Sequence, residues 1–169
     1  PQQSCPRTRT TQFVDRLPTD NPSVTFEPAQ LDDVDAMVAL RIEAMRESLE
    51  RIGRFDPKRA RERFTSNFTP SHTRHVLVQG KRVGFVVVIP ESDELVLEHL
   101  YISPSAQGRG YGAQVLCAIF DEADSKSLPI RVGALRDSDS NRFYMRHGFS
   151  LVRRAEHENY YVRASRNVL

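Results

Sequence analysis

The chain has 169 residues, of which 39% are hydrophobic and 27% charged, the size and balance of one ordinary globular domain. No apolar run approaches the roughly 20 residues that a membrane-spanning helix needs, so we expect no membrane partner. The formal net charge of +2 is too small to indicate nucleic acid as the main partner.

The N-terminal stretch is rich in Pro, Gln, Thr and Arg and shows little hydrophobic periodicity. We expect residues 1–20 to be disordered or a remnant of cloning, and residues 21–169 to form the folded domain. The stretch lacks the apolar segment of a secretory signal. Cys5 lies in it and Cys117 in an apolar helical run, so no disulfide between them is expected. Reduced cysteines without a signal indicate the cytoplasm.

The first elements are a short strand and two helices. Residues 24–26 favour a strand, and from residue 31 to about 50 apolar side chains recur at the spacing of one helix face. Gly53 ends this helix, and Asp56 followed by Pro57 predicts the N-cap and first position of the second. The apolar positions of the first helix are Val34, Met37, Val38, Ile42 and Met45, and the acidic residues suited to its N-terminal end are Asp32, Asp33 and Asp35.

Three strands follow, predicted over residues 75–78, 83–89 and 95–102. The first two flank a tight turn and form a hairpin, and the short acidic segment 91–94 makes the third antiparallel to the second. Residues 86–89 are apolar on both faces, which indicates a strand covered on both sides.

The remaining elements alternate between helix and strand. The helix that begins near Gly112 directs apolar side chains to a core, and a strand over residues 130–135 follows it. Ser138 or Asp139 is expected to cap a short helix that ends at Gly148. The last antiparallel pair spans residues 149–153 and 160–163. The apolar residues of the longer helix are Val115, Leu116, Ile119 and Phe120.

Three glycines alternate immediately before that helix, in the segment Gln107-Gly108-Arg109-Gly110-Tyr111-Gly112. Glycine lets the backbone turn sharply and lets a ligand approach its N–H groups closely. A helix N-terminus adds unpaired donors and a partial positive charge, and Arg109 can add a charge-assisted contact. The segment therefore predicts a phosphate site.

Other interpretations of the segment compete. A Walker loop needs Lys and Ser or Thr after its last glycine, and Gly112-Ala113-Gln114 lacks them. A dinucleotide fingerprint is formally present from Gly108 to Ala113, which leaves a nucleotide-dependent oxidoreductase open. Against it, the preceding strand ends at Ile102, several residues before the first glycine, and follows an antiparallel hairpin. A flexible loop without a ligand is the purely structural alternative.

The arrangement Gln107-x-x-Gly110-x-Gly112, after the strand that ends in Leu100-Tyr101-Ile102, resembles the pyrophosphate-binding motif of the GNAT superfamily of N-acetyltransferases. Residues 141–149, where a helix ends in Gly148-Phe149, resemble a later motif of that family. The resemblance covers residues 24–163. It implies an α/β (mixed α+β) single domain with a central mixed, mostly antiparallel sheet of about six to seven strands and about four flanking helices.

The resemblance also implies how a cosubstrate binds. In that family the strands matching residues 95–102 and 130–135 splay apart, and the pantetheine arm of acetyl-CoA lies between them. Backbone groups of Leu100, Tyr101 and Ile102 would bind this arm and stabilise an oxyanion. No metal is needed. The pyrophosphate would lie on Gln107, Gly108, Arg109, Gly110, Tyr111 and Gly112.

Asn141 and Tyr144 are three residues apart and share one helix face. By resemblance, Asn141 would hydrogen-bond the pantetheine and Tyr144 would protonate the departing thiolate. Ordinary pKa values of about 10 and 8.5 make that transfer uphill by roughly 2 kcal/mol. A Tyr144 that is simply packed as an aromatic is the alternative.

Glu98 is the candidate base that deprotonates the acceptor amine, directly or through a water. It lies among apolar residues, where burial would raise its pKa. His99 is the alternative, and adjacent strand residues point to opposite faces, so at most one of them should face the acceptor.

The predicted reaction transfers an acetyl group to a primary amine by direct attack in a ternary complex, with a small molecule favoured over a protein as acceptor. The first two helices and the last hairpin, including Tyr160 or Tyr161, are expected to bind that acceptor. A longer acyl-CoA donor and a CoA-binding module without catalysis stay open, and a homodimer is compatible with the sequence.

Overall fold

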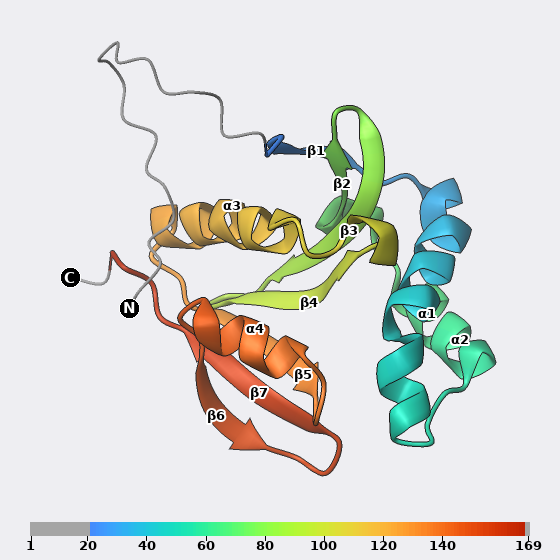
Figure 1. Cartoon of the computed structure of the whole chain (residues 1–169). Coiled ribbons are helices and arrows are strands. Elements are labelled where there is room, and N and C mark those ends of the chain that lie inside the picture. The colour runs from blue at the N-terminus through green and yellow to red at the C-terminus, as the bar shows by residue number, and fades with distance from the viewer. Residues whose placement is uncertain (1–20, 168–169) are drawn as a thin grey trace.

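The computed structural model describes residues 21–167, in which one seven-stranded sheet separates two helical layers (Figure 1). The strand order is β1-β2-β3-β4-β5-β7-β6, and every neighbouring pair is antiparallel except β4 and β5. The fold is thus the mixed, mostly antiparallel α/β architecture that the sequence predicts. The strands are β1 Val24–Pro28, β2 Thr73–Val78, β3 Lys81–Pro90, β4 Leu95–Ile102, β5 Ile130–Leu135, β6 Ser150–Arg154 and β7 Glu158–Arg163.

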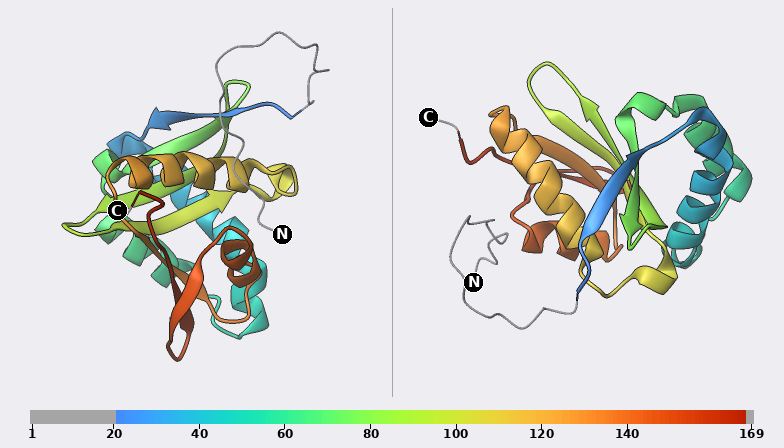
Figure 2. Two further views of the ribbon diagram at one scale, coloured as in Figure 1. Left: turned by 90° about the vertical axis from the view of Figure 1, so that its left-hand side faces the viewer. Right: turned by 90° about the horizontal axis from the view of Figure 1, so that it is seen from above.

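The helices cover both faces of the sheet, with α1 and α2 on one side and α3 on the other (Figure 2). β3 shows why both layers are needed, because Val86 and Val88 pack into the α3 core while Phe85 and Val87 pack into the α1–α2 core. The prediction of a strand covered on both faces is confirmed. The helices are α1 Val34–Arg51, α2 Pro57–Asn67, α3 Tyr111–Ser125 and α4 Ser140–Arg146, with 3-10 turns at Leu31–Asp33, Pro70–His72 and Pro104–Ala106.

The two predicted helix caps have different outcomes. The Asp56 carboxylate accepts a hydrogen bond of 3.0 Å from the Arg59 N–H, so the predicted cap of α2 is confirmed. The expected side-chain cap of α4 is wrong, because neither Ser138 nor Asp139 accepts from a backbone N–H of that helix. The Ser138 hydroxyl instead donates to the Leu135 carbonyl at 2.7 Å, which tightens the turn before α4.

Asp33 connects the start of α1 to the sheet, a role that the helix dipole alone does not predict. Its carboxylate lies 2.9 Å from His75 Nε2 and accepts 3.0 Å and 2.7 Å hydrogen bonds from Arg82 and from the Gln30 N–H. His75 is buried. The hydrogen bond from His75 is the main reason that the pKa of Asp33 falls to about 2, with the Gln30 N–H as the next cause.

Of the two cysteines, the structure describes Cys117. Cys117 is half-buried on α3 and disulfide-bonded, so the expectation of a reduced, buried thiol at this position is wrong. Cys5 lies outside the described residues. Among residues 21–167, none of the helices has both the length and the apolar character to cross a bilayer.

We predict that Asp33→Asn lowers the free energy of unfolding at pH 7 by about 1–2 kcal/mol. A depressed carboxyl pKa stabilises the fold above the unfolded-state value of about 4 and loses that contribution as the pH falls toward 2. The difference between wild type and variant should therefore shrink between pH 4 and pH 2.5 in urea titrations. Asp32→Asn, at an exposed neighbour, is the control. An Asp33→Asn difference that is the same at both pH values would contradict the prediction.

Candidate active site

β4 and β5 separate halfway along their length. Their parallel pairing runs from Leu95 opposite Ile130 to Leu97 opposite Val132 and stops there. β4 continues along β3, and β5 continues along β7, to the end of each strand. Backbone groups of β4 beyond Leu97 that point toward β5 thus have no strand partner. The two strands open a slot, as the resemblance implies.

Glu98 lies at a β-bulge where the slot begins. The adjacent β3 residues Val88 and Val87 pair with Leu97 and His99. Glu98 has no partner on β3 and is therefore the extra residue of β4. The bulge resets the alternation of side chains. Leu97 and Ile102 pack into the α3 core, whereas His99 and Tyr101 stack on the α1–α2 side with ring centroids 5.6 Å apart.

The glycine loop presents unpaired backbone donors at the N-terminus of α3. Gly108 and Gly110 have φ angles of +77° and +81°, a left-handed conformation that favours glycine. The first backbone donor of the helix is the Gln114 N–H, which reaches the Gly110 carbonyl at 3.1 Å. Within the described part of the chain, the N–H groups of residues 110–113 have no acceptor. The loop therefore fits the oxygens of a pyrophosphate.

The other residues of the loop hold it in place. Gln107 Nε2 donates to the Ile102 carbonyl at 2.9 Å, so its side chain ties the loop to the end of β4 rather than pointing outward. A Cβ atom on Gly112 would lie 3.2 Å from Phe143 Cζ, which shows how closely α3 approaches α4. The Tyr111 side chain is buried in the α3 core and the Arg109 side chain is exposed. Among these side chains, only Arg109 is free to approach an outer phosphate.

Two cavities meet at the slot. The larger, of about 1560 Å³, lies along the glycine loop and α4, and the smaller, of about 800 Å³, lies between α1, α2 and the strands β4, β5 and β7. A long ligand on the glycine loop can therefore reach through the slot into the smaller cavity. The residues that line both are Ala44, Ser48, Leu100, Ile102, Gln107 and Ser140.

Tyr144 projects from α4 into this meeting point. Its ring is buried against Phe149 and Tyr161, with centroid distances of 5.4 Å and 6.4 Å, and burial raises the pKa of its hydroxyl above the ordinary value. Tyr144 lines the smaller cavity, and within residues 21–167 its hydroxyl makes no hydrogen bond. The hydroxyl oxygen therefore borders the cavity without a protein partner among these residues, and it is available to a ligand.

Both polar atoms of the Asn141 side chain form hydrogen bonds within the fold. Nδ2 donates to the Leu135 and Ser138 carbonyls, both at 2.9 Å. Oδ1 accepts from the Tyr161 hydroxyl at 2.7 Å and from Asn159 Nδ2 at 2.9 Å. Binding of pantetheine by the Asn141 side chain would need one of these bonds to be exchanged, and it stays a prediction. What the structure assigns to Asn141 is the position of α4.

The two candidate bases differ in environment. Glu98 is exposed on the wall of the smaller cavity, so the expected burial is wrong, because the bulge turns this residue out of the regular alternation. His99 is the buried one, and burial together with the nearby Arg41 charge lowers its pKa to about 3. His99 is therefore neutral and weakly basic at pH 7, which favours Glu98. Across residues 21–167, no His, Cys, Asp and Glu side chains gather in threes to hold a metal ion.

Four charged residues of the smaller cavity were missed by the sequence analysis, namely Arg41 on α1, Arg63 on α2, Arg131 on β5 and Glu158 at the start of β7. Arg41 follows Met37 by one helical turn, so a charge at an apolar position was the available signal. Tyr160 lines the same cavity and donates to the Glu158 carboxylate at 2.8 Å, whereas Tyr161 is buried. The expected contribution of the first two helices and last hairpin to this cavity is thus present.

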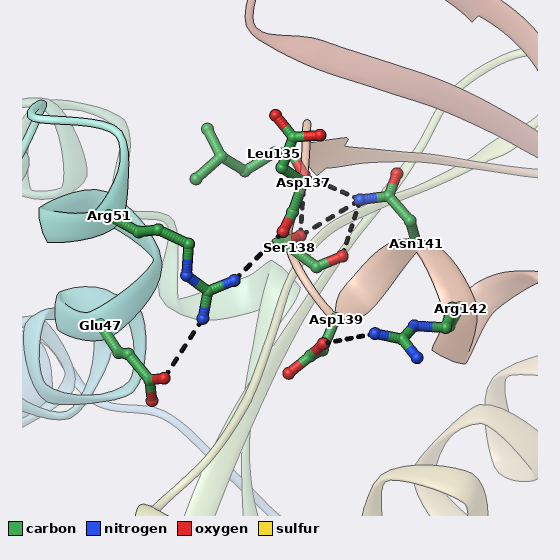
Figure 3. A network of polar contacts seen from close by, with 8 residues as sticks. All are labelled: Glu47, Arg51, Leu135, Asp137, Ser138, Asp139, Asn141 and Arg142. Atoms are coloured by element: carbon green, nitrogen blue, oxygen red, sulfur yellow. Dashed lines mark hydrogen bonds and ion pairs between the residues drawn. The ribbon is translucent and has the colours of Figure 1, made fainter.

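Across the larger cavity, α1 contacts the loop between β5 and α4 (Figure 3). Arg51 near the end of α1 lies 3.4 Å from the carbonyl of Asp137 and 3.2 Å from the Glu47 carboxylate. On the α4 side, Arg142 pairs with Asp139 at 3.4 Å (Figure 3). Of these three contacts, the hydrogen bond from Arg51 to Asp137 joins the two walls at the cavity rim, and the two exposed ion pairs each lie within one wall.

A slot between diverging parallel strands, unpaired donors at its mouth and a second cavity behind it define an acyltransferase of the GNAT fold. Residues 71–151 match the family model described as an acetyltransferase (GNAT) domain. The resemblance stated from the two motifs is thus confirmed by this match, which covers residues 71–151.

Solved structures of this fold superpose on the chain at low sequence identity. The PaiA N-acetyltransferase of Thermoplasma acidophilum, crystallised with coenzyme A, is 13% identical over 84% of this chain and 99% of its own, with a TM-score of 0.69. An acetyltransferase of Thermus thermophilus is 17% identical over 85% of this chain and 98% of its own, with a TM-score of 0.65. A GNAT acetyltransferase of Bacillus cereus is 16% identical over 84% of this chain and 97% of its own, with a TM-score of 0.60. These likenesses concern the fold. Among curated proteins the chain has no match.

We predict that Asn141→Ala lowers the free energy of unfolding by about 2–4 kcal/mol, because it leaves the buried Tyr161 hydroxyl without its acceptor and removes the hydrogen bonds to the Leu135 and Ser138 carbonyls. Urea unfolding followed by circular dichroism measures this loss. Arg142→Ala, on the exposed face of the same helix, is the matched control and should change stability by less than about 0.5 kcal/mol.

A double-mutant cycle tests the cause. Tyr161→Phe should destabilise the wild type more than it destabilises Asn141→Ala, because the hydroxyl has already lost its acceptor in the variant. Fully additive losses would show that the network does not hold α4.

Proposed function

We propose that this protein transfers an acetyl group from acetyl-CoA to a primary amine of a small molecule, by direct attack of the amine in a ternary complex. The observation that supports this is the end of β4–β5 pairing at Leu97, next to the unpaired N–H groups of residues 110–113. A thioester at the slot can then meet an amine that enters through the smaller cavity.

The donor is held mainly by backbone. The N–H groups at the start of α3 and the Arg109 guanidinium bind the pyrophosphate, and the backbone groups of Leu100, Tyr101 and Ile102 that point toward β5 bind the pantetheine arm. Acetyl-CoA supplies an acyl group activated as a thioester. Because the positions of these backbone donors are fixed by the sheet and by α3, they need little reorganisation to stabilise the oxyanion.

Glu98 and Tyr144 each carry out one proton transfer, Glu98 as the base and Tyr144 as the acid. The acceptor is an ammonium at neutral pH, and the Glu98 carboxylate takes its proton, directly or through a water. The nitrogen–carbon bond forms, the carbon–sulfur bond breaks, and the Tyr144 hydroxyl gives its proton to the sulfur. Because its pKa is raised, the Tyr144 hydroxyl would give its proton to a free thiolate only unfavourably. We therefore propose that this proton moves to the sulfur while the carbon–sulfur bond breaks. The proton on Glu98 then restores Tyr144 through solvent, and the attacking nitrogen releases its second proton to water as the neutral amide forms.

The unpartnered Tyr144 hydroxyl favours this enzyme over a module that only binds CoA. Binding alone needs the glycine loop and the slot, which lie along the larger cavity. It does not need a buried hydroxyl directed at the smaller one. A residue packed for its ring alone would be better as Phe, since burying an unpaired hydroxyl destabilises the fold.

We predict that Gly110→Val weakens coenzyme A binding by more than tenfold in titration calorimetry. A β-branched residue is strained at a φ of +81°, so the unpaired N–H groups should turn away from the ligand. Gly80→Val is the matched control, because Gly80 has a φ of +76° in the β2–β3 turn with open space around its Cβ position. Both variants should lose similar stability, but Gly80→Val should keep its affinity. Equal affinity in both would remove the loop from the donor site.

We predict that Tyr144→Phe lowers kcat at least tenfold while the affinity for acetyl-CoA changes by less than threefold. Thiol release from acetyl-CoA is followed against a panel of primary amines, and calorimetry gives the affinity. Phe143→Leu changes an adjacent α4 ring without a polar group and is the control for packing. A Tyr144→Phe variant with unchanged kcat would exclude Tyr144 as the acid.

A further inference from the structure

The smaller cavity has opposite charges on opposite walls. Arg41 and Arg63 line it from α1 and α2, and Glu98 and Glu158 line it from β4 and β7. In the described part of the chain, none of these four side chains forms an ion pair. Arg131 also lines the cavity, but its guanidinium is already paired with Glu94 at 2.8 Å. The cavity therefore offers a cationic and an anionic subsite to whatever enters it.

Arg41 is the most constrained of these groups. Its Nη1 donates to the Ala60 carbonyl at 3.2 Å, while its Nε is buried and has no hydrogen-bond partner within residues 21–167. The guanidinium faces His99 and Tyr101, since its charge acts on the pKa of both. The contact with Ala60 holds α1 against α2, and a hydrogen bond to the Tyr101 hydroxyl uses a second donor, so the five N–H donors of the guanidinium are only partly used. A half-buried cation without a counter-charge calls for an anion from the ligand.

We propose that the acceptor is an aminocarboxylate, bound with its carboxylate on Arg41 and its ammonium at Glu98 and Glu158. This inference rests on the proposed function and names its substrate class. The planar guanidinium fits a carboxylate through paired charge-assisted hydrogen bonds. The ammonium then lies on the β4 side, next to the slot through which the thioester reaches it. A polycation would meet Arg41 and Arg63, and a simple monoamine would leave Arg41 unpaired.

The middle of the cavity indicates the body of the acceptor. Phe64, Phe68 and Ile89 line it between the charged walls, and the ring of Phe64 lies 5.4 Å from that of His99. His99 is neutral, so it adds no charge to this surface. The arrangement suits an α-amino acid with an apolar side chain.

The experiment compares matched pairs of amines in the thiol-release assay with the full chain. Phenylalanine is compared with phenethylamine, methionine with its decarboxylated amine, and spermidine is the polycation. We expect kcat/KM to favour each amino acid over its decarboxylated partner at least tenfold, with spermidine poorest. Amines without a carboxylate that react as well as the amino acids would overturn the proposal.

Variants test whether Arg41 causes the preference. Arg41→Met keeps an apolar stem and should reduce the amino acid to amine ratio at least tenfold, chiefly through KM, and Arg41→Lys should restore part of it. Arg59→Met removes the same charge from an exposed position of α2 outside the cavity and should leave the ratio unchanged. Because both substrates are measured on one variant, partial unfolding cancels from the ratio. An unchanged ratio in Arg41→Met would overturn the proposal.

Titration with acetyl-CoA separates this inference from the proposed function. Binding and thiol release without a preference for carboxylates would overturn the acceptor class alone. Absence of both acetyl-CoA binding and thiol release with every amine would overturn the proposed function, and the acceptor class with it.

Discussion

The end of hydrogen bonding between β4 and β5 at Leu97 is the constraint on which the rest of the site depends. A sheet that stayed paired to Ile102 would satisfy its own backbone and leave no slot. The bulge at Glu98 changes the direction of β4 where its pairing with β5 ends, so β4 follows β3 while β5 follows β7. Donors that would have joined two strands are thereby left to a ligand.

The helices α3 and α4 keep the slot open and position the groups around it. α3 brings the unpaired N–H groups of the glycine loop to the mouth of the slot, and the close approach of Gly112 to Phe143 sets its distance from α4. Asn141 fixes α4 to the end of β5 and to β7 with four hydrogen bonds of 2.7–2.9 Å. Tyr144, one turn further along α4, takes its position from this network rather than from hydrogen bonds of its own.

The helices on the other side decide what can enter. α1 and α2 cover one face of the sheet (Figure 2), and their Arg41 and Arg63 line the same cavity as Glu98 and Glu158, together with aromatic rings. A charge in a partly buried cavity acts more strongly than one in water, because fewer solvent dipoles screen it. The neutral His99 is a direct result, since burial and the Arg41 charge both oppose its protonation. The two cavities that meet at the slot thus differ in character.

Local pattern determined much of the chain. Apolar periodicity gave β4 and β5 their observed bounds, and the alternating glycines located the loop, because helix, strand and turn preferences depend on residues close in sequence. The contacts of each residue with distant parts of the chain were decided by the tertiary structure. Only the register of β3 against β4 shows that Glu98 is the extra, exposed residue. Only packing brings Asn141 to Tyr161 and directs Arg41 into a cavity. Spacing along a chain specifies which residues share a face of one element, but hydrogen-bond partners and burial depend on segments that folding brings together from distant positions.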